Sequence, residues 1–454
     1  MGGYPAAIRA AQLGMRVALI EEDKLGGTCL HRGCIPTKAL LQTAELLDRL
    51  RHADAFGVSV KDVGLDYATA GKRRDQVVGQ LHRGVEFLMK KNKINVIRGH
   101  GRLAGAGRVT VVVNGQDTTD VEAGNVIIAT GSRPKVPSGV ETDGKHVITS
   151  DHALQLNRVP ASAIVLGAGA VGVEFASLYA SCGAQVTLVE LLPSLVPLED
   201  HDVGVELKKQ FEARGINCVV NARMDLASIE RNEGGVAASI IDGDGTERRV
   251  QAEVLLIAIG RAANVEDIGL DGSKVRVEKG AIQVDQLLRT AEPNVSAIGD
   301  VAGGFQLAHK AAHEGVIAVE AIAGRDPEPM PSTHVTRTTY CAPQIGSLGL
   351  SETEAKEAGY DVATGTFPFR ANGRALIWGE SAGFCKVVAD RAGGNVLGVH
   401  VIGHEVTELI WGPALGALLE ATPFEMGRAV APHPTLSEVL SEAALAVRGE
   451  AIHI

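Results

Sequence analysis

One glycine pattern restricts the fold of this chain more than any other feature. Residues 163–172 read AIVLGAGAVG, an apolar run typical of a strand followed by Gly167, Gly169 and Gly172. A glycine pattern of this kind is weak evidence alone, but here it follows a predicted strand and opens a predicted helix. A second predicted strand then ends at Glu190. This combination is typical of a βαβ unit that binds a dinucleotide.

Each residue of the pattern has its own physical role. Gly167 allows a tight turn, Gly169 lets the backbone approach a pyrophosphate, and Gly172 lets the helix pack closely on the strand. The helix N-terminus offers free N–H groups to the phosphates. Glu190 would accept hydrogen bonds from a ribose diol and repel a 2′-phosphate, and no Arg or Lys occurs in residues 191–197. The pattern therefore predicts NAD rather than NADP, the alternative being a glycine-rich turn without a ligand.

The start of the chain repeats the second half of this unit. Residues 3–21 (GYPAAIRAAQLGMRVALIE) align with residues 172–190 (GVEFASLYASCGAQVTLVE), each with a small-residue helix, a glycine, a strand and an acid. Seven positions are identical, namely Gly3/Gly172, Ala7/Ala176, Ala11/Ala180, Gly14/Gly183, Val17/Val186, Leu19/Leu188 and Glu21/Glu190. Only the third glycine of the pattern, Gly3, is present in the first copy. We therefore expect a second dinucleotide-binding unit that is cut through its phosphate loop and lacks its first strand.

Length and composition limit the remaining interpretations. The 454 residues suffice for about three domains. The 44 basic and 54 acidic residues give a net charge of −10 without a block of Lys or Arg, which argues against a nucleic-acid partner. No apolar run approaches the ~20 residues that span a bilayer, and the N-terminus does not resemble a signal peptide. We expect no membrane partner and a cytoplasmic location.

Two of the six cysteines lie close together in the stretch LGGTCLHRGCIPTKALL. Four residues separate Cys29 from Cys34, and Pro36 suits the first turn of a helix that continues through residues 37–50. Cys34 would then lie near a helix N-terminus, where a thiolate is favoured, and the pair would form a disulfide suited to exchange. Zinc needs a second ligand pair at matching spacing, for which His31 alone is insufficient. A buried, inert pair is the other alternative.

The segment GGTC-x4-GCIP-x-K resembles the active-site segment of flavin-dependent disulfide oxidoreductases, and its exact form is most similar to dihydrolipoyl (lipoamide) dehydrogenases. The resemblance covers nearly the whole chain. It implies an α/β fold with two Rossmann-like dinucleotide-binding domains, for FAD and NAD, plus an α+β C-terminal dimerisation domain. The implied division is an FAD-binding domain at 1–140 with a helical insert at 35–95, an NAD-binding domain at 141–265, a return to the FAD domain at 266–334 and a dimerisation domain at 335–454.

The same resemblance implies cofactor positions residue by residue. The matching segments are GHGRLAG (99–105), IIATGSRP (127–134), AIGR (258–261), NVSAIGDVAG (294–303) and QLAHKAAHEG (306–315). Asp300 is implied to bond the ribityl chain of the flavin, Lys38 and Glu174 to form an ion pair beside it, and Gly260 to adjoin the nicotinamide nucleotide. The other implied FAD positions are Gly3, Glu21, Gly26, Gly27, Thr28, Gly101, Thr130, Gly131, Ser132, Leu307, Ala308 and His309.

The C-terminal part changes character from about Val335. Residues 364–390 and 395–403 read as alternating strands and residues 406–421 as a helix, an order that resembles the family's dimerisation domain. His400, His404 and Glu408 are evenly spaced and raise a metal hypothesis. Because residues 398–403 are predicted as strand, these three side chains would not share a helical face. We therefore expect ordinary structure there and no metal.

Near the end, the stretch APHPTLSEVLSEAAL places His433 before a proline, in an extended or turn segment, and Glu438 at the start of the last helix. A histidine and a glutamate five residues apart are ordinarily surface residues. The match to the family's His-Pro-Thr-Leu-Ser-Glu motif implies instead that His433 is the acid/base and that Glu438 orients and charges its imidazole. Because the family's histidine serves the disulfide of the partner subunit, the resemblance implies a homodimer.

The implied reaction is the oxidation of protein-bound dihydrolipoamide to lipoamide with NAD⁺. In it, His433 deprotonates a dihydrolipoyl thiol, Cys29 takes the mixed disulfide, and Cys34 passes electrons on to FAD and then to NAD. The expected partners are a second copy of the chain and the lipoyl domains of 2-oxo acid dehydrogenase or glycine-cleavage complexes. Four departures from usual family residues remove no catalytic group: Pro5, Ala263, Gln344 and Ala431.

Two alternatives stay open at this point. One is another disulfide reductase of the same fold, although Glu190 argues against an NADP-dependent glutathione type and the cysteine-free tail (446–454) against mercuric reductase. The other is a non-catalytic product deficient in FAD, because the absent strand would be central and leave the edges of its neighbours unpaired. On this basis we expect the gene to start further upstream and the chain as given to retain FAD weakly.

Overall fold

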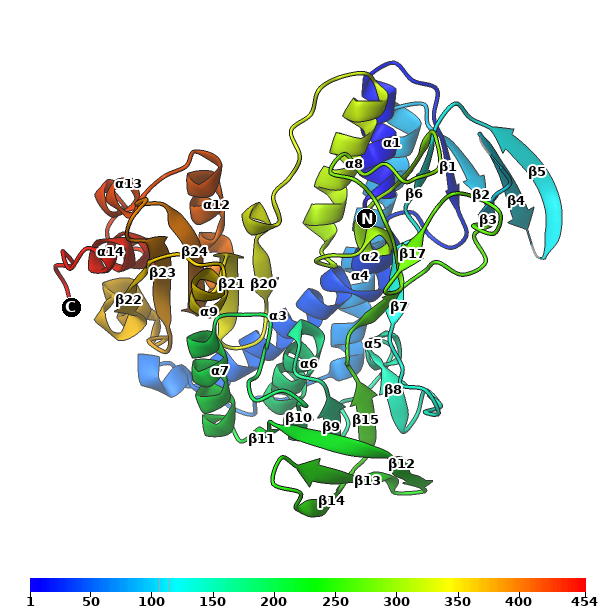
Figure 1. Cartoon of the computed structure of the whole chain (residues 1–454). Coiled ribbons are helices and arrows are strands. Elements are labelled where there is room, and N and C mark those ends of the chain that lie inside the picture. The colour runs from blue at the N-terminus through cyan, green and yellow to red at the C-terminus, as the bar shows by residue number, and fades with distance from the viewer. Residues whose placement is uncertain (106, 114) are drawn as a thin grey trace. The chain divides into compact units, whose positions relative to one another are not determined.

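The structure of the chain is a computed structural model that describes residues 1–105, 107–113 and 115–454 (Figure 1). The chain divides into two compact units. The first contains residues 1–39, 69–135 and 261–330, and the second contains residues 40–68, 136–260 and 331–454. Two long helices, α3 (Cys34–Arg51) and α4 (Tyr67–Lys91), contribute residues to both. None of the described helices is long and apolar enough to cross a membrane.

Parallel strand pairs organise the first unit. β1 (Ala18–Glu21) pairs in parallel with β2 (Asn95–Arg98), and β19 (Val295–Ala297) pairs in parallel with β6 (Val126–Ile128). Within the described ranges these pairs are separate two-stranded sheets. The other elements of this unit are α1 (Gly3–Gln12), α2 (Gly27–Arg32), β3 (His100–Leu103), β4 (Arg108–Val113), β5 (Gln116–Glu122), β7 (Ser132–Pro134), β16 (Arg261–Ala263), β17 (Val277–Glu278), β18 (Ala281–Ile282), η2 (Gly299–Ala302) and α8 (Ala308–Ile322).

Small residues let α1 pack closely against α8. Ala6 and Ala10 of α1 lie in one apolar cluster with Ala318 and Val319 of α8. A Cβ atom at Gly315 would lie only 2.8 Å from the carbonyl oxygen of Gly2, so the two helices approach to a distance that a side chain there would prevent. The small-residue helix predicted from the internal repeat is therefore confirmed, together with the reason for its small residues.

A five-stranded parallel sheet, in the order β11-β10-β9-β15-β8, forms the first half of the second unit. Its apolar residues are buried on both faces, as is usual for parallel sheets. The predicted strand–helix–strand unit is observed as β9 (Ser162–Leu166), α6 (Ala170–Ser181) and β10 (Gln185–Val189). The neighbouring elements are η1 (Ala53–Phe56), β8 (Val147–Thr149), α5 (Ser150–Ala153), α7 (His201–Ala213), β11 (Asn217–Val219), β12 (Ala222–Asn232), β13 (Gly235–Asp242), β14 (Glu247–Ala252) and β15 (Val254–Ile257).

The second half of this unit is an antiparallel sheet in the order β20-β21-β24-β23-β22, against which the last helix packs (Figure 1). Phe367 and Val387 of the sheet share a buried cluster with Ala443 and Ala444 of that helix. The elements are η3 (Ser332–His334), β20 (Arg337–Thr339), β21 (Gln344–Gly349), α9 (Glu352–Glu357), β22 (Val362–Pro368), η4 (Phe369–Ala371), α10 (Gly373–Trp378), β23 (Phe384–Asp390), β24 (Val396–Gly403), α11 (Val406–Leu409), α12 (Trp411–Leu418), α13 (Pro423–Arg428) and α14 (Glu438–Val447).

Two sequence predictions in this half are wrong. Residues 364–390 are not strands throughout, because η4 and α10 interrupt them; the Asn372 side chain caps α10 by accepting the amide of Ala375 at 3.0 Å. The helix predicted over 406–421 is divided into α11 and α12. Pro413 has no N–H to donate to the carbonyl four residues earlier, that of Leu409, where α11 ends.

A buried lysine lies between the two halves of this unit. The ammonium of Lys386 on β23 is 3.0 Å from Asp200, 2.7 Å from Asp202 and 2.8 Å from Glu352. Burial alone would lower the pKa of Lys386, but the bonds from the three carboxylates raise it. Asp200 is also almost fully buried and caps α7 by accepting the amide of Asp202. Removing this lysine would therefore leave a buried negative charge without its cation.

We expect Lys386→Met to lower the free energy of unfolding by about 3–5 kcal/mol, because it breaks a buried ion pair by removing one partner. The matched control is Lys356→Met, which removes an exposed lysine that pairs with the same Glu352. It should change the free energy of unfolding by less than about 0.5 kcal/mol. Urea unfolding of both variants measures the two free energies of unfolding. Equal losses of stability would contradict the claim that the buried ion pair contributes more than the exposed one.

Candidate active site

The structure brings the two predicted redox cysteines together. Cys29 lies on α2, and Cys34 is the first residue of α3. Both are free thiols, and their side chains are hydrogen-bonded to each other. This bond to Cys34, then burial and the charge of Cys34, raise the pKa of Cys29, while Lys38 opposes the rise. The two thiols are therefore a contacting pair in which one sulfur shares its hydrogen with the other.

The contact between the thiols depends on the glycine before Cys34. A Cβ atom at Gly33 would lie 3.2 Å from the carbonyl oxygen of Thr28 and 3.3 Å from Cα of Cys29. The Thr37 hydroxyl donates to the Gly33 carbonyl at 2.6 Å, and the Thr37 amide donates to it at 3.2 Å. Gly33 thus lets α2 approach the start of α3. Through its two bonds to the Gly33 carbonyl, Thr37 fixes the first turn of α3.

His31, considered in the sequence as a metal ligand, serves instead to hold the cysteine segment. Its Nε2 donates to the carbonyl oxygen of Leu25 at 2.9 Å, and Nδ1 of His82 donates to the same oxygen at 3.0 Å. The two rings meet edge to face at 5.1 Å. Burial, the largest influence, lowers the pKa of His31 and favours its neutral form. His82 comes from α4, and sequence reasoning missed it because no local pattern marks it.

Asp300, the predicted ribityl contact, lies in a polar cluster of the same unit. The Ser132 hydroxyl donates to the carboxylate of Asp300. Arg261 donates through Nε to the Ser132 hydroxyl and through Nη2 to the Ser132 carbonyl, each at 2.7 Å. Arg261 was missing from the predicted set, although it ends the quoted segment AIGR. Ser132 and Asp300 are both predicted to contact the flavin. Their direct hydrogen bond supports the prediction that they face the same ligand.

Buried groups of α8 hold the segment that carries Asp300. Glu314 accepts the amide of Gly299 at 2.7 Å and pairs with Lys310 at 2.5 Å. Lys310 in turn donates to the carbonyl of Gly303 at 3.0 Å. Both ends of η2 are therefore bonded to one helix. The predicted residues Leu307, Ala308 and His309 form the beginning of that helix, where Leu307 is the N-cap residue.

The remaining predicted FAD positions combine open backbone with one half-buried acid, Glu21. At Gly131, φ is +71° and no atom lies within 4 Å of the place that a Cβ would occupy, so the backbone is accessible to a ligand. Gly26 and Gly27 also have positive φ, +111° and +66°. Burial raises the pKa of Glu21 at the end of β1. The further positions lie at the start of α1 (Gly3), on α2 (Thr28), on β3 (Gly101) and beside Gly131 (Thr130).

The glycines of the second unit form a cradle for phosphates. A Cβ atom at Gly167 would lie 2.6 Å from the Ala258 carbonyl oxygen, and one at Gly172 would lie 1.8 Å from the Gly167 carbonyl oxygen. At Gly169 nothing lies within 4 Å. Gly169 is also the N-cap of α6, without a side-chain cap, so the helix N-terminus is open to an anion. The predicted roles of all three glycines fit this geometry.

Glu190 links this loop to the end of β10. Its Oε2 accepts the amide of Ala168 at 2.7 Å, and its Oε1 accepts the amide of Leu192 at 2.9 Å. The carboxylate is buried, so these two amides keep it in place beside the glycine loop. Gly260, the predicted nicotinamide neighbour, follows β15 with φ at +110° and open space around it. The residues present fit a dinucleotide whose ribose carries no 2′-phosphate.

The Lys38–Glu174 ion pair stays a prediction, because the two residues belong to different units. Glu174 is buried on α6, and its Oε1 accepts the amide of Tyr340 at 2.9 Å. Lys38 lies on α3 and lowers the pKa of Cys29 through its charge.

His433 and Glu438 form the predicted pair. Nδ1 of His433 lies 2.8 Å from Oε1 of Glu438, whose other oxygen accepts the Thr435 amide at 3.0 Å. Asn372 donates to the Thr435 carbonyl at 3.0 Å and so fixes this turn to α10. Burial raises the pKa of Glu438, but the bonds from His433 and Thr435 outweigh it and lower the pKa overall. Because Nδ1 is engaged, Nε2 of the exposed imidazole is the nitrogen that can exchange a proton with a substrate.

The metal hypothesis for His400, His404 and Glu408 does not match the arrangement of these residues. His400 is fully buried on β24 and donates from Nε2 to the Leu350 carbonyl at 2.9 Å. Instead, ligand atoms of Glu45, His404 and Glu405 lie within 4.8 Å of one another. Nη2 of Arg49 lies 2.7 Å from Glu45 and 2.9 Å from His404. A guanidinium thus already supplies positive charge to this group.

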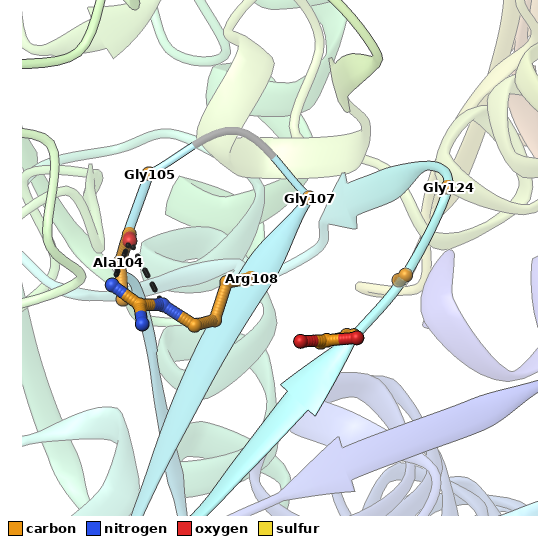
Figure 2. Close-up of a pocket in the computed structure, with 7 residues that line it drawn as sticks. Ala104, Gly105, Gly107, Arg108 and Gly124 are labelled. Carbon is orange, nitrogen blue, oxygen red and sulfur yellow. Dashed lines mark hydrogen bonds between the residues drawn. The ribbon is translucent and has the colours of Figure 1, made fainter.

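A hollow of about 570 Å³ lies where β4 begins and β5 ends (Figure 2). Its lining is mostly backbone of small residues, with the side chains of Arg108 and Glu122. Arg108 bonds the Ala104 carbonyl at 3.2 and 3.3 Å, as Figure 2 shows. The hollow contains none of the predicted site residues, and we assign no chemistry to it.

Comparison with known proteins agrees with this geometry. Residues 1–315 match the family model described as pyridine nucleotide-disulphide oxidoreductase, and residues 335–444 match the dimerisation domain of that family. The dihydrolipoyl dehydrogenase of Bacillus subtilis (strain 168) is 45% identical, over 100% of this chain and 97% of that protein. The dihydrolipoyl dehydrogenase of Zymomonas mobilis is 44% identical over the same shares.

Solved structures give the same assignment. LpdA from Mycobacterium tuberculosis matches with a TM-score of 0.90 at 28% identity, over 98% of this chain and 96% of that chain. The HOCl-induced flavoprotein disulfide reductase RclA from Escherichia coli matches with a TM-score of 0.84 at 26% identity, over 98% and 97%. The chain belongs to the pyridine nucleotide-disulphide oxidoreductase family.

Proposed function

We propose that this protein is a dihydrolipoyl dehydrogenase, which oxidises protein-bound dihydrolipoamide to lipoamide with NAD⁺ as the final acceptor. The observation that carries the proposal is the thiol–thiol hydrogen bond between Cys29 and Cys34 at the start of α3. The His433–Glu438 pair supplies the matching acid–base group. Similarity to dihydrolipoyl dehydrogenases along the whole chain supports this substrate over other disulfides.

The proposed thiol chemistry begins with Cys29 and Cys34 joined as a disulfide. His433 of the partner subunit takes the proton of one dihydrolipoyl thiol, and the resulting thiolate attacks Sγ of Cys29. The Cys29–Cys34 bond breaks, and Cys34 leaves as a thiolate. The second substrate thiol then attacks its own sulfur in the mixed disulfide, so that lipoamide leaves and Cys29 becomes a thiol. Two electrons have passed to the cysteine pair, which is left as a Cys29 thiol and a Cys34 thiolate, and the first substrate proton is on His433 of the partner subunit.

The residues present fit NAD in the second unit and the ribityl contact of a flavin in the first. Ser132 and Asp300, with Arg261 behind them, would hold the flavin, and the glycine loop at 167–172 with Glu190 would hold NAD. When bound, FAD supplies the hydride chemistry that connects the cysteine pair to NAD⁺. The chain's own part is to keep the thiols in contact, to position the cofactors and to move the substrate proton.

We further infer a homodimer in the cytoplasm that serves the lipoyl domains of 2-oxo acid dehydrogenase or glycine-cleavage complexes. The match of residues 335–444 to a dimerisation domain supports the dimer. So do large apolar side chains that stand exposed on this part: Leu376, Ile377, Trp411, Leu418 and Leu419. We retain the division into FAD-binding (1–140, 266–334), NAD-binding (141–265) and dimerisation (335–454) domains; the union of residues 1–39 with 261–330 in one unit supports it.

The direct test is NADH formation from dihydrolipoamide, followed at 340 nm, on protein whose flavin content is measured at 450 nm. We expect turnover with NAD⁺ and none of comparable rate with glutathione disulfide and NADPH. Faster reduction of glutathione disulfide would favour the alternative reductase. Protein without flavin that stays inactive when FAD is added would favour the non-catalytic alternative.

Cys34→Ser and Cys29→Ser should each abolish oxidation of dihydrolipoamide, because no disulfide can form between the two positions. NADH oxidation with ferricyanide should persist in both, since this electron transfer needs the flavin but not the cysteines. Cys341→Ser, at a buried cysteine outside the Cys29–Cys34 segment, is the matched control and should keep both activities. Lipoamide turnover in either active-site variant would contradict the role of the pair.

His433→Ala should lower kcat for dihydrolipoamide by about 10²–10⁴-fold, the usual contribution of a positioned general acid or base. Glu438→Gln should have a smaller effect, because the amide can still contact Nδ1 but no longer stabilises the imidazolium. Ferricyanide reduction by NADH is the internal control. It involves no dihydrolipoyl thiol, so it does not need His433 to take a proton. Loss of both activities to the same extent would indicate a structural defect instead.

Glu190→Ala should reduce the preference for NAD⁺ over NADP⁺ at least tenfold, because the carboxylate that repels a 2′-phosphate is removed. Glu190→Gln removes the charge but keeps an oxygen that can accept an amide of Ala168 or Leu192. It therefore separates repulsion of the 2′-phosphate from support of the glycine loop at 167–172. Steady-state kcat/KM for both nucleotides measures the effect. An unchanged ratio in both variants would show that Glu190 does not select the nucleotide.

A further inference from the structure

A second histidine–glutamate pair joins α14 to the C-terminal tail. Its glutamate, Glu442, lies one turn beyond Glu438, and its histidine, His453, lies on the tail. Oε1 of Glu442 lies 2.8 Å from Nδ1 of His453. The other oxygen of Glu442 accepts the amides of Ile452 at 3.0 Å and His453 at 3.2 Å. The side chain of Glu442 is 11% exposed, whereas that of His453 is 69% exposed. A nearly buried carboxylate therefore binds the tail of the chain through three hydrogen bonds.

The chain turns back along α14 to make these bonds. After the last helical residue, Val447, the amide of Glu450 donates to the Leu445 carbonyl at 3.0 Å. Gly449 has φ at +70°, a conformation that favours glycine and that reverses the chain direction at a helix end. Residues 450–453 thus return toward the first turns of α14, and His453 lies beside the turn that follows Glu438.

The two pairs share one face of the helix. Residues four apart in an α-helix are neighbours, so Glu438 and Glu442 are two like charges side by side, each with its own histidine. Burial raises the pKa of Glu442, but the bonds from His453 and Ile452 and the charge of His453 lower it overall. The charge of His453 also helps to lower the pKa of Glu438. The tail histidine therefore acts on both carboxylates.

Other charged groups near this face have partners of their own. On α13, Glu425 accepts the amide of Thr422 at 2.9 Å, and Arg428 lies over the ring of Phe424 at 5.1 Å. On the tail, Arg448 pairs with Glu450 at 3.1 Å. Strand β22 offers no titratable group, and Lys386 of β23 is bound by its three carboxylates. His453 is thus the basic side chain that lies against Glu442.

We propose that the C-terminal tail is a working part of the acid–base site, with His453 a positioning residue that sets the pH range in which His433 functions. This rests on the proposed function, in which His433 takes the substrate proton. In its protonated form, His453 balances the charge of Glu442, which it contacts at 2.8 Å. Without it, Glu442 adds its negative charge to that of Glu438 beside the His433 imidazole. The protonated imidazole is then favoured, and in that form it cannot accept a proton from the substrate.

The test compares the pH profiles of kcat/KM for dihydrolipoamide between pH 5.5 and 9. For His453→Ala, the acidic limb should move to higher pH by about half a unit, as expected for unit charges ~8 Å apart in nearly aqueous surroundings. The ratio of the rate at pH 6 to the rate at pH 8 should fall about threefold. His453→Asn keeps an N–H donor without the charge, so it should shift the profile in the same direction.

A charge-balancing cycle separates this electrostatic role from a structural one. Glu442→Gln alone should move the acidic limb to lower pH, because a negative charge is lost. The double variant, Glu442→Gln with His453→Ala, should return the limb close to that of the unaltered protein. A merely structural tail predicts instead that the double variant is at least as impaired as either single one. Arg448→Gln, on the same tail, is the control and should not change the pH 6 to pH 8 ratio.

The outcomes distinguish the two proposals. If His433→Ala retains full turnover, the proposed acid–base role is wrong, and the role of the tail is wrong with it. If His433→Ala is inactive but both His453 variants keep the original profile, only the role of the tail is wrong. If His453→Ala does not fold, His453→Asn and Glu442→Gln still give opposite shifts when the proposal is correct, and shifts of the same sign overturn it.

Discussion

The contact between two sulfur atoms is the arrangement on which the proposed chemistry depends. It exists because Gly33 has no side chain, so that α2 can approach the first turn of α3 at distances that a Cβ atom would not tolerate. His31, which lies between the two cysteines, donates to the Leu25 carbonyl, and His82 of α4 donates to the same oxygen. The cysteines thus occupy a short, doubly fixed loop, and their reactivity follows from backbone placement more than from any single charged neighbour.

Carboxylates in this protein do three different things, and their surroundings decide which. Asp200 is buried with Lys386 and stabilises the junction of two sheets. Glu190 is buried against two backbone amides and gives shape and charge to a nucleotide loop. Glu438 lies near the surface, where it holds the histidine that we propose as the acid–base group. The number and kind of donors around each acid, not its position in a motif, separate these roles.

Local signals in the sequence predicted the β9–α6–β10 unit and the cysteine loop, because each depends on residues close in the chain. The His433–Glu438 pair followed only from the resemblance to a family motif. The contacts that sequence reasoning missed join distant residues: His82 to Leu25 across 57 positions, and Lys386 to Asp200 across 186. No local pattern marks such partners. The wrong predictions have a different origin, since the cap at Asn372 and the break before Pro413 overrode an apolar pattern that fits either strand or helix.

The packing of α1 on α8 has a consequence for how the chain reaches its fold. Arg9 and Glu320, which join these helices at 2.9 Å, are 311 positions apart, so the first unit closes a very long loop. The parallel sheet of the second unit, in contrast, uses only residues 147–257. During synthesis this sheet has all its strands while α1 still lacks its partner. Helix α1 can therefore pack against α8 only after every strand of the parallel sheet is available.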